Sequence, residues 1–184
     1  MKAVMISIQP KYVELIANGQ KTIEVRKTRP KIDTPFKCYI YCTKGENLWL
    51  TQKGVKSKTE LAGYLMNGKV IGHFVCDRIE DFSQWEFDYF ALLRHINLFA
   101  GTNHDYKFLD DYIKGQKKGY AWHISDLVIY EQPKEVGEFV RPCDRYLDCI
   151  TCKRLVRNDY LSCDNKITRP PKSWCYVEEK EEDR

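Results

Sequence analysis

The segment Gly19 to Arg26 most constrains the fold, because it combines a glycine turn with an alternation of apolar and charged residues. In an extended strand, successive side chains point to opposite faces, so Ile23 and Val25 would share one face. The other face would carry Thr22, Glu24 and Arg26, with Lys21 where the chain leaves the glycine. The pattern predicts a strand with core on one side and a candidate polar site on the other. An ordinary solvated strand face with weak surface pairs remains an equal alternative at this point.

The residues before this segment predict how it is positioned. Residues 3–8 are apolar except for Ser7 and indicate a buried strand. Pro10 opens an amphipathic stretch that predicts a short helix, because proline is tolerated in the first turn. Gly19 then stands where a glycine commonly ends a helix. The expected order is strand, helix, glycine turn, strand.

Further strands are expected at residues 36–43, 70–78 and 121–130, because these segments are rich in β-branched and aromatic residues. Helices are expected at 105–114, with Phe108, Leu109, Tyr112 and Ile113 on one stripe, and at 87–99. The predicted fold class is α+β: a single domain over residues 1–184, built as a small mixed β-barrel. Its expected additions are a helical insertion at about 82–119, a cysteine-rich segment at about 141–168, a final strand at about 172–178 and a disordered acidic tail at about 179–184.

The charge distribution favours a polyanionic partner. The chain has a formal charge of +4, while residues 178–184 hold five acids and two bases, so residues 1–177 carry +7. Six cations fall within seventeen residues: Lys21, Arg26, Lys27, Arg29, Lys31 and Lys37. Such a density suits nucleic acid, although a solubilising surface is the alternative. The sequence predicts no membrane span and no signal peptide, so we expect a cytoplasmic protein with reduced cysteines.

Four cysteines in the polar segment after residue 141 form a candidate metal site: Cys143, Cys149, Cys152 and Cys163. Four thiolates bind Zn²⁺ in a tetrahedral site that leaves no coordination position for a substrate. We therefore expect a structural zinc that stabilises the fold. Metal-free reduced cysteines are one alternative, an iron–sulfur cluster is a weaker one, and Cys175 could replace one ligand. The remaining cysteines, Cys38, Cys42 and Cys76, resemble small core residues.

Catalytic candidates are few. The chain has no glycine-rich phosphate loop, zinc-protease motif or esterase elbow, which leaves acid–base chemistry or binding. His123 shares a predicted strand face with Ser125, opposite Trp122, so both polar residues could face a cleft; a satisfied surface histidine is the alternative. His73 has less support.

The spacing Gly19-x-Lys21-x-x-Glu24-x-Arg26 resembles the G-x-K-x-x-E-x-R signature of the ASCH domain. Other segments are similar to phage- and prophage-encoded members of that family: residues 23–30, 38–42, 70–72, 122–127 and 169–177. The resemblance covers nearly the whole chain, and is loose at about 51–69 and 82–119. It implies a PUA-like β-barrel that binds RNA.

The motif residues Gly19, Lys21, Thr22, Glu24 and Arg26, together with His123 and Ser125 from the predicted strand face, form the expected ligand site. By the resemblance, it would bind RNA, another nucleic acid or a modified nucleoside. Stacking candidates are Tyr12, Tyr39, Tyr41 and Trp122. The alternative is a metal-independent ribonuclease or amidohydrolase that uses Lys21, Glu24 and His123. Some family members resemble amidohydrolases in which the motif lysine activates a threonine three residues later. Here that position holds Glu24, so Thr22 would have to be recruited. A protein-interaction adaptor is the third hypothesis.

Overall fold

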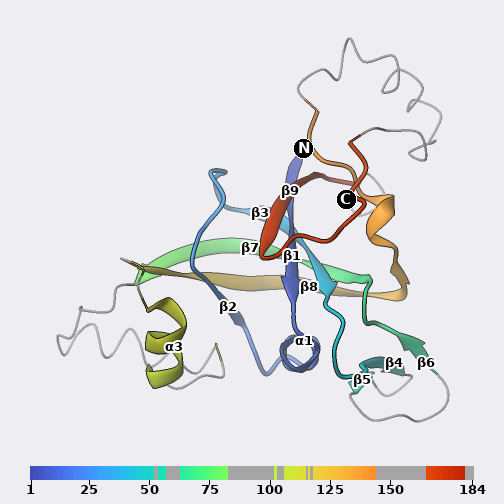
Figure 1. Cartoon of the computed structure of the whole chain (residues 1–184), viewed down its shortest axis with the longest axis horizontal. Helices are drawn as coiled ribbons and strands as arrows, with labels where there is room; N and C mark the ends of the chain where they lie inside the picture. Colours follow the sequence, from blue (N-terminus) through green and yellow to red (C-terminus); the bar gives the residue numbers. More distant parts are fainter. Residues whose placement is uncertain are drawn as a thin grey trace.

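A six-stranded, mostly antiparallel sheet forms the body of the protein in this computed structural model, in the order β2-β8-β7-β3-β1-β9 (Figure 1). The structure describes residues 1–51, 54–56, 63–82, 102, 106–114, 116, 118–143 and 165–180. The strands are β1 (Lys2–Ile8), β2 (Ile23–Arg26), β3 (Phe36–Cys42), β7 (Val70–Phe82), β8 (Gly119–Lys134) and β9 (Trp174–Glu178). All the predicted strands are present, and β7 and β8 are longer than expected.

The central strands β1 and β3 pair in parallel and are buried on both faces. One face carries a cluster that includes Ile6, Ile40 and Trp122, and the other a cluster that includes Met5 and Tyr39. This explains why residues 3–8 are apolar on both strand faces, with Ser7 as the exception, instead of alternating. The three predicted core cysteines, Cys38, Cys42 and Cys76, lie in the first cluster.

Helix α1 (Pro10–Ala17) ends in a glycine cap that sets the position of the charged motif. Gly19 has φ +70°, a conformation that favours glycine because it has no Cβ. Its N–H donates to the carbonyl of Ile16 at 2.9 Å, and that of Gln20 donates to Leu15 at 2.8 Å. This is the Schellman arrangement expected after a helix. The N–H of Lys21 also reaches Leu15, at 3.0 Å, so the cap fixes the backbone of the motif lysine.

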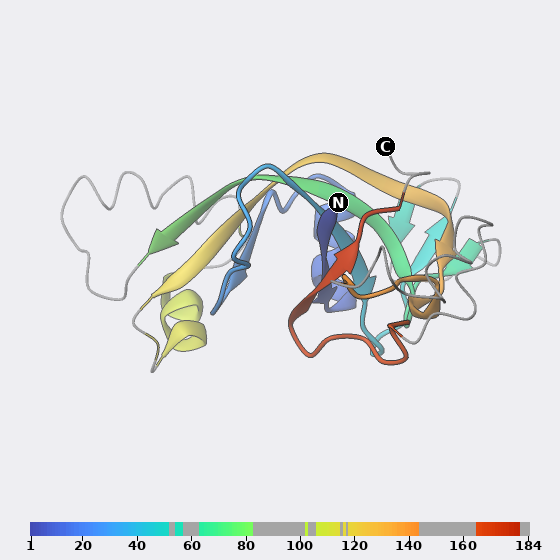
Figure 2. The same cartoon turned by 90° about the horizontal axis from the view of Figure 1, so that it is seen from above.

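Helix α3 (Tyr106–Ile113) covers the end of the sheet where β2 pairs with β8. Leu109 and Ile113 are buried against Ile23 and Val25, which confirms that this face of β2 is core. Figure 2 shows β7 and β8 as a long double arch with α3 beneath one end. The predicted helix at 87–99 lies outside the described residues.

A second, three-stranded sheet was not predicted from the sequence. It consists of β4 (Trp49–Thr51), β5 (Gly54–Lys56) and β6 (Gly63–Leu65), in the order β5-β4-β6. In the views of Figures 1 and 2 it lies at the end of the molecule opposite α3. Strands of three residues give too little alternation to be recognised.

The main sheet is open within the described residues, which corrects the expectation of a closed barrel. Strand β2 lies at one edge and β9 at the other. Between these edges, side-chain hydrogen bonds take the place of backbone pairing between strands. Arg26 donates to the carbonyl oxygen of Ser7 at 2.6 Å, and the indole of Trp174 donates to the hydroxyl of Thr28 at 3.0 Å. A pocket lined by residues of β1 and β2 lies at this opening. The fold class is therefore α+β, mostly sheet, with two helices described.

The first two residues of the expected acidic tail, Glu179 and Lys180, contact the body of the protein. The N–H of Glu179 donates to the Met1 carbonyl at 2.8 Å, and its carboxylate lies 3.3 Å from the ammonium of Lys37. The N–H of Lys180 donates to the hydroxyl of Tyr39 at 2.9 Å. The other four tail residues lie outside the described part. Among described residues, no helix has the length and apolar character needed to cross a membrane.

Candidate ligand pocket

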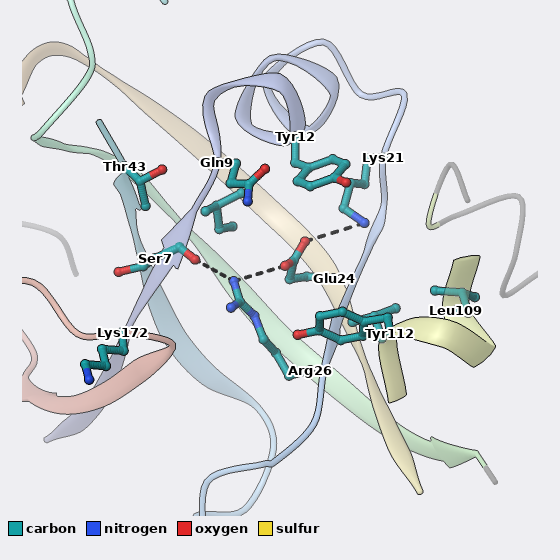
Figure 3. Close-up of a pocket in the computed structure, with 12 residues that line it drawn as sticks. Ser7, Gln9, Tyr12, Lys21, Glu24, Arg26, Thr43, Leu109, Tyr112 and Lys172 are labelled. Atoms are coloured by element: carbon teal, nitrogen blue, oxygen red, sulfur yellow. Dashed lines mark hydrogen bonds and ion pairs between the residues drawn. The ribbon is translucent and has the colours of Figure 1, made fainter. Parts of the chain in front are cut away.

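A pocket of about 320 Å³ opens between α1, α3 and the edge strand β2 (Figure 3). Three residues of the G-x-K-x-x-E-x-R motif, Lys21, Glu24 and Arg26, form part of its wall and are called the buried triad below. Its other lining residues are Ser7, Ile8, Gln9, Tyr12, Val25, Thr43, Leu109, Tyr112 and Lys172. Gly19, the first residue of the motif, does not line the pocket; it ends helix α1.

Lys21 is almost completely buried, with 2% of its surface exposed. Its ammonium donates to the carbonyl oxygens of Ile23 at 2.7 Å and Thr102 at 3.0 Å. It also lies 3.5 Å from a carboxylate oxygen of Glu24. An ammonium has three donors, so these three contacts account for all of them. Lys21 therefore works mainly as a fixed positive charge that positions Glu24.

Glu24 lies between the other two members of the triad. One carboxylate oxygen faces Lys21 and the other lies 3.0 Å from the guanidinium of Arg26 (Figure 3). Arg26 also reaches the carbonyl of Ser7, and more loosely the hydroxyl of Ser173 at 3.5 Å. Its Nε is buried without a partner in the described part of the chain. An ionised carboxylate has about four acceptor positions, so Glu24 keeps acceptor capacity beyond these two contacts.

Burial controls the electrostatics of the triad. Desolvation lowers the pKa of Lys21, while the neighbouring Glu24 carboxylate opposes that shift. Two cations and one carboxylate leave a net charge of +1 in the wall of the pocket. Lys172 adds an exposed ammonium at its rim. The pocket thus combines a positive field with a carboxylate acceptor, and suits a ligand with both a negative group and a polar N–H group.

Sequence reasoning missed several lining residues because they come from distant segments. Gln9 and Thr43 follow the parallel strands β1 and β3, and the Thr43 N–H donates to Ile8 at 2.9 Å. The carboxyl ends of parallel strands meet at one edge of a sheet, so the order of these strands would have been the signal. Lys172 lies in the polar stretch before β9, and no local pattern predicts that this stretch reaches the pocket.

Two tyrosines line the pocket from different helices. Tyr12, one of the predicted stacking candidates, comes from α1, and its ring centroid is 5.7 Å from the Lys21 ammonium. Tyr112 comes from α3, where its place on the apolar stripe predicted a core residue. Burial raises the pKa of the Tyr112 hydroxyl, which therefore stays a hydrogen-bond donor at neutral pH. The other candidates, Tyr39, Tyr41 and Trp122, are buried core residues.

His123 and Ser125 do not line this pocket. Trp122 is the β8 residue paired with Glu24, so it shares the pocket face and fills the core, whereas His123 pairs with Ile23 on the opposite face. There His123 lies 3.2 Å from Glu80 and 3.2 Å from the guanidinium of Arg78. The hydroxyl of Ser125 donates to the carbonyl of Val75 at 3.0 Å. The sequence correctly predicted that His123 and Ser125 lie on the face of β8 opposite Trp122. Which of the two faces borders the pocket depends on the curvature of the sheet, and this was not predicted.

Two other predicted groups also lie away from the pocket. Thr22 is exposed, and its carbonyl accepts the N–H of Ile124 at 2.9 Å. His73 is buried at 3.0 Å from the hydroxyl of Tyr130. A threonine nucleophile at Thr22 would therefore stand outside the pocket wall.

The predicted zinc site falls mostly outside the described residues. Cys143 is partly exposed, and Cys149, Cys152 and Cys163 are not described. Across the residues that are described, no group of three or more histidine, cysteine or acidic side chains could hold a metal. Cys175 is partly buried in β9, and burial raises the pKa of its thiol.

The fold and the pocket define a small α+β domain whose charged motif lies at the open edge of a curved sheet. The chain belongs to the ASCH domain family, whose model matches residues 6–134. The crystal structure of ASCH from Zymomonas mobilis is similar, with 19% identity, a TM-score of 0.51, and coverage of 98% of this chain and 90% of that chain. A tyrosine-to-phenylalanine mutant of the Zymomonas mobilis protein matches with 18% identity, a TM-score of 0.51, and coverage of 100% and 94%. At this identity the likeness shows the fold alone. No curated protein matches the chain.

Proposed function

We propose that the pocket binds one nucleoside of an RNA, plain or modified, with Glu24 of the buried triad contacting its base. The observation that carries this proposal is the Glu24 carboxylate, which is held between two buried cations at 3.5 and 3.0 Å and keeps acceptor capacity. A carboxylate in such a position accepts hydrogen bonds from an exocyclic amine, as acidic side chains do from the N4 amine of cytosine. The two cations fix the direction in which its oxygens point.

The size and the lining of the pocket support a ligand of this kind. Its volume of about 320 Å³ is at the lower end for small-molecule sites and suits a single nucleoside. Tyr12 and Tyr112 supply aromatic surface, and exposed bases of unpaired RNA stack on such side chains. Lys172 at the rim supplies an exposed ammonium, the kind of group that neutralises phosphates. Membership of the ASCH family is consistent with a nucleic-acid ligand.

A hydrolytic activity is the second candidate, and one observation favours it. Desolvation lowers the pKa of Lys21, as in lysines that act as general bases. The geometry favours binding instead, because the Lys21 ammonium uses its three donors on Ile23, Thr102 and Glu24, and a proton-accepting amine would have to give one up. We therefore propose binding as the primary function, with amide or phosphodiester hydrolysis as the alternative.

The test titrates the four ribonucleosides, with an N-acylated cytidine beside them, and follows amide chemical shifts by NMR. We expect saturable shifts at the pocket and a loss of at least about tenfold in affinity for Glu24→Gln. Thr43→Val, which keeps the triad, should weaken binding less. The matched control is Glu80→Gln, because that carboxylate also contacts an arginine but lies outside the pocket.

The outcomes separate the hypotheses. No nucleoside shift in the wild type, or equal affinity in Glu24→Gln and the wild type, would sink the proposed function. Product formation that is lost in Lys21→Ala would replace binding by hydrolysis. Absence of binding to any nucleic acid at low salt would favour a protein-interaction adaptor.

We also propose a structural zinc held by Cys143, Cys149, Cys152 and Cys163, on the strength of their spacing and the scarcity of apolar residues between them. Elemental analysis of protein purified without chelator should find about one zinc per chain. Cys149→Ser should lose that zinc together with thermal stability, whereas Cys76→Ser should keep the zinc. A zinc-free native sample would contradict the proposal.

A further inference from the structure

Two exposed loops next to the pocket carry a concentrated positive charge. Residues 27–35 connect β2 to β3, and residues 168–173 precede β9; together they are called the basic loops. They hold five cations and one acid, a net charge of +4, from Lys27, Arg29, Lys31, Arg169, Lys172 and Asp33. All six side chains are exposed, and the five cations form no ion pair with other described residues. Positive charge that is not bound in ion pairs is left available for a ligand.

The basic loops are attached to the same edge of the sheet. The indole of Trp174 in β9 donates to the Thr28 hydroxyl at 3.0 Å. The backbone N–H of Lys31 donates to the hydroxyl of Tyr176, also in β9, at 2.6 Å. These contacts hold the loop at 27–35 against β9, so its cations belong to one surface with those of residues 168–173.

This surface begins at the pocket. Lys172 lines the pocket directly. The Lys27 ammonium lies 5.2 Å from the ring centroid of Tyr112, another lining residue. Arg29 is next along the loop, 6.0 Å from the ring of Tyr120. Such cation–aromatic contacts restrict the cations to the side of the molecule where the pocket lies.

The surface also continues beyond the loops. Tyr176, which contacts Lys31, borders a second hollow of about 340 Å³ together with Lys2 and Arg141. Neither of these cations has an ion pair with another described residue. Cations with aromatic side chains between them therefore extend from the pocket past the loops, as in proteins that hold unpaired nucleic acid.

We propose that the ligand is a single RNA strand rather than a free nucleoside: one nucleoside enters the pocket, and the neighbouring phosphates lie on the basic loops. This inference rests on the proposed function of the pocket. A free nucleoside has no phosphates to meet the loop cations, whereas a strand presents one at each step. Lysine and arginine neutralise these phosphates and release counterions, which ties affinity to salt concentration.

The test measures binding of an unstructured, fluorescein-labelled RNA of about twelve nucleotides by anisotropy, between about 50 and 200 mM salt. The loop variant combines Lys27→Gln, Arg29→Gln and Lys31→Gln. The control removes the same charge near η1 (Val136–Glu138), by Lys69→Gln, Lys134→Gln and Lys166→Gln. Ribonucleoside titrations of both proteins report on the pocket alone.

We expect the loop variant to lose about tenfold or more in RNA affinity at low salt and to flatten the slope of log K against log salt by up to about 2, since each lost phosphate contact removes about 0.7. Its nucleoside affinity should stay unchanged. Equal RNA losses in the loop and control variants, or wild-type RNA binding no tighter than nucleoside binding, would overturn the inference and leave the pocket intact. RNA binding without any nucleoside binding would instead overturn the proposed function.

Discussion

Two charged clusters lie on opposite faces of the same sheet, and they differ in burial. The buried triad faces the pocket, and its three side chains are 2–10% exposed. On the other face Arg78, Glu80 and His123 form an open cluster with side chains 18–63% exposed. Both join an acid to two basic groups at about hydrogen-bond distance: Glu24 to Arg26 is 3.0 Å, and Glu80 to Arg78 is 2.9 Å.

Distance therefore does not distinguish a site from a surface pair here, whereas desolvation does. Exposed pairs contribute about 0–1 kcal/mol because water and salt screen them. A buried pair loses its hydration on folding, and removing one member leaves an uncompensated charge. Burying the triad therefore costs free energy of folding, and a role in ligand binding explains why such an arrangement is present. The open cluster costs little and needs no functional explanation.

The largest expected effect comes from Glu24→Gln. It leaves the charges of Lys21 and Arg26 buried without their carboxylate, so the free energy of unfolding should fall by about 3–5 kcal/mol. Glu80→Gln should change it by less than about 1 kcal/mol. Urea unfolding of both variants measures the difference. Equal effects would show that burial is not what separates the two clusters.

A smaller difference is expected for the arginines. Arg26→Leu removes the hydrogen bonds to Ser7 and Glu24 that bridge the sheet opening, and should cost about 2–3 kcal/mol. Arg78→Leu, in the open cluster, should again stay within about 1 kcal/mol. Thermal unfolding followed by circular dichroism gives both values. A harmless Arg26→Leu would mean that the backbone alone holds the opening.

The smallest effect concerns the pH dependence contributed by His123. Burial, and then Arg78, lowers its pKa below the usual value, against the opposing carboxylates of Glu80 and Asp77. Below the unfolded pKa of about 6.5, the unfolded state therefore binds more protons, and stability rises as pH increases through the window just below that value. His123→Asn should flatten this part of the stability curve by less than about 1 kcal/mol. A steeper curve in the variant would reverse the assigned sign.

Local features of the site were predictable from the sequence, and long-range features were not. The helix end at Gly19 and the alternation that separates Ile23 from Glu24 depend on neighbouring residues, and both are confirmed. The side of β8 that faces the pocket depends on how the whole sheet curves, so His123 lies on the face opposite the expected one. The contributions of Thr43 and Lys172 depend on strand order and on a distant loop, which no local pattern records.

In the fold, too, local features were predictable from the sequence and long-range features were not. Long strands such as β7 and β8 were recognised, although their ends were underestimated because their exposed halves carry charge. A barrel was expected both from the order of the predicted elements and from the family resemblance. Whether β2 reaches a partner beyond β8 depends on how strands distant in the sequence are arranged, which does not follow from periodicity.

The most direct test of the pocket as a nucleoside site is a crystal structure of the protein with a short RNA. We expect a base within hydrogen-bond distance of Glu24, between Tyr12 and Tyr112, and a phosphate beside Lys172. RNA bound only in the hollow between Lys2 and Arg141, with the pocket filled by water, would contradict it.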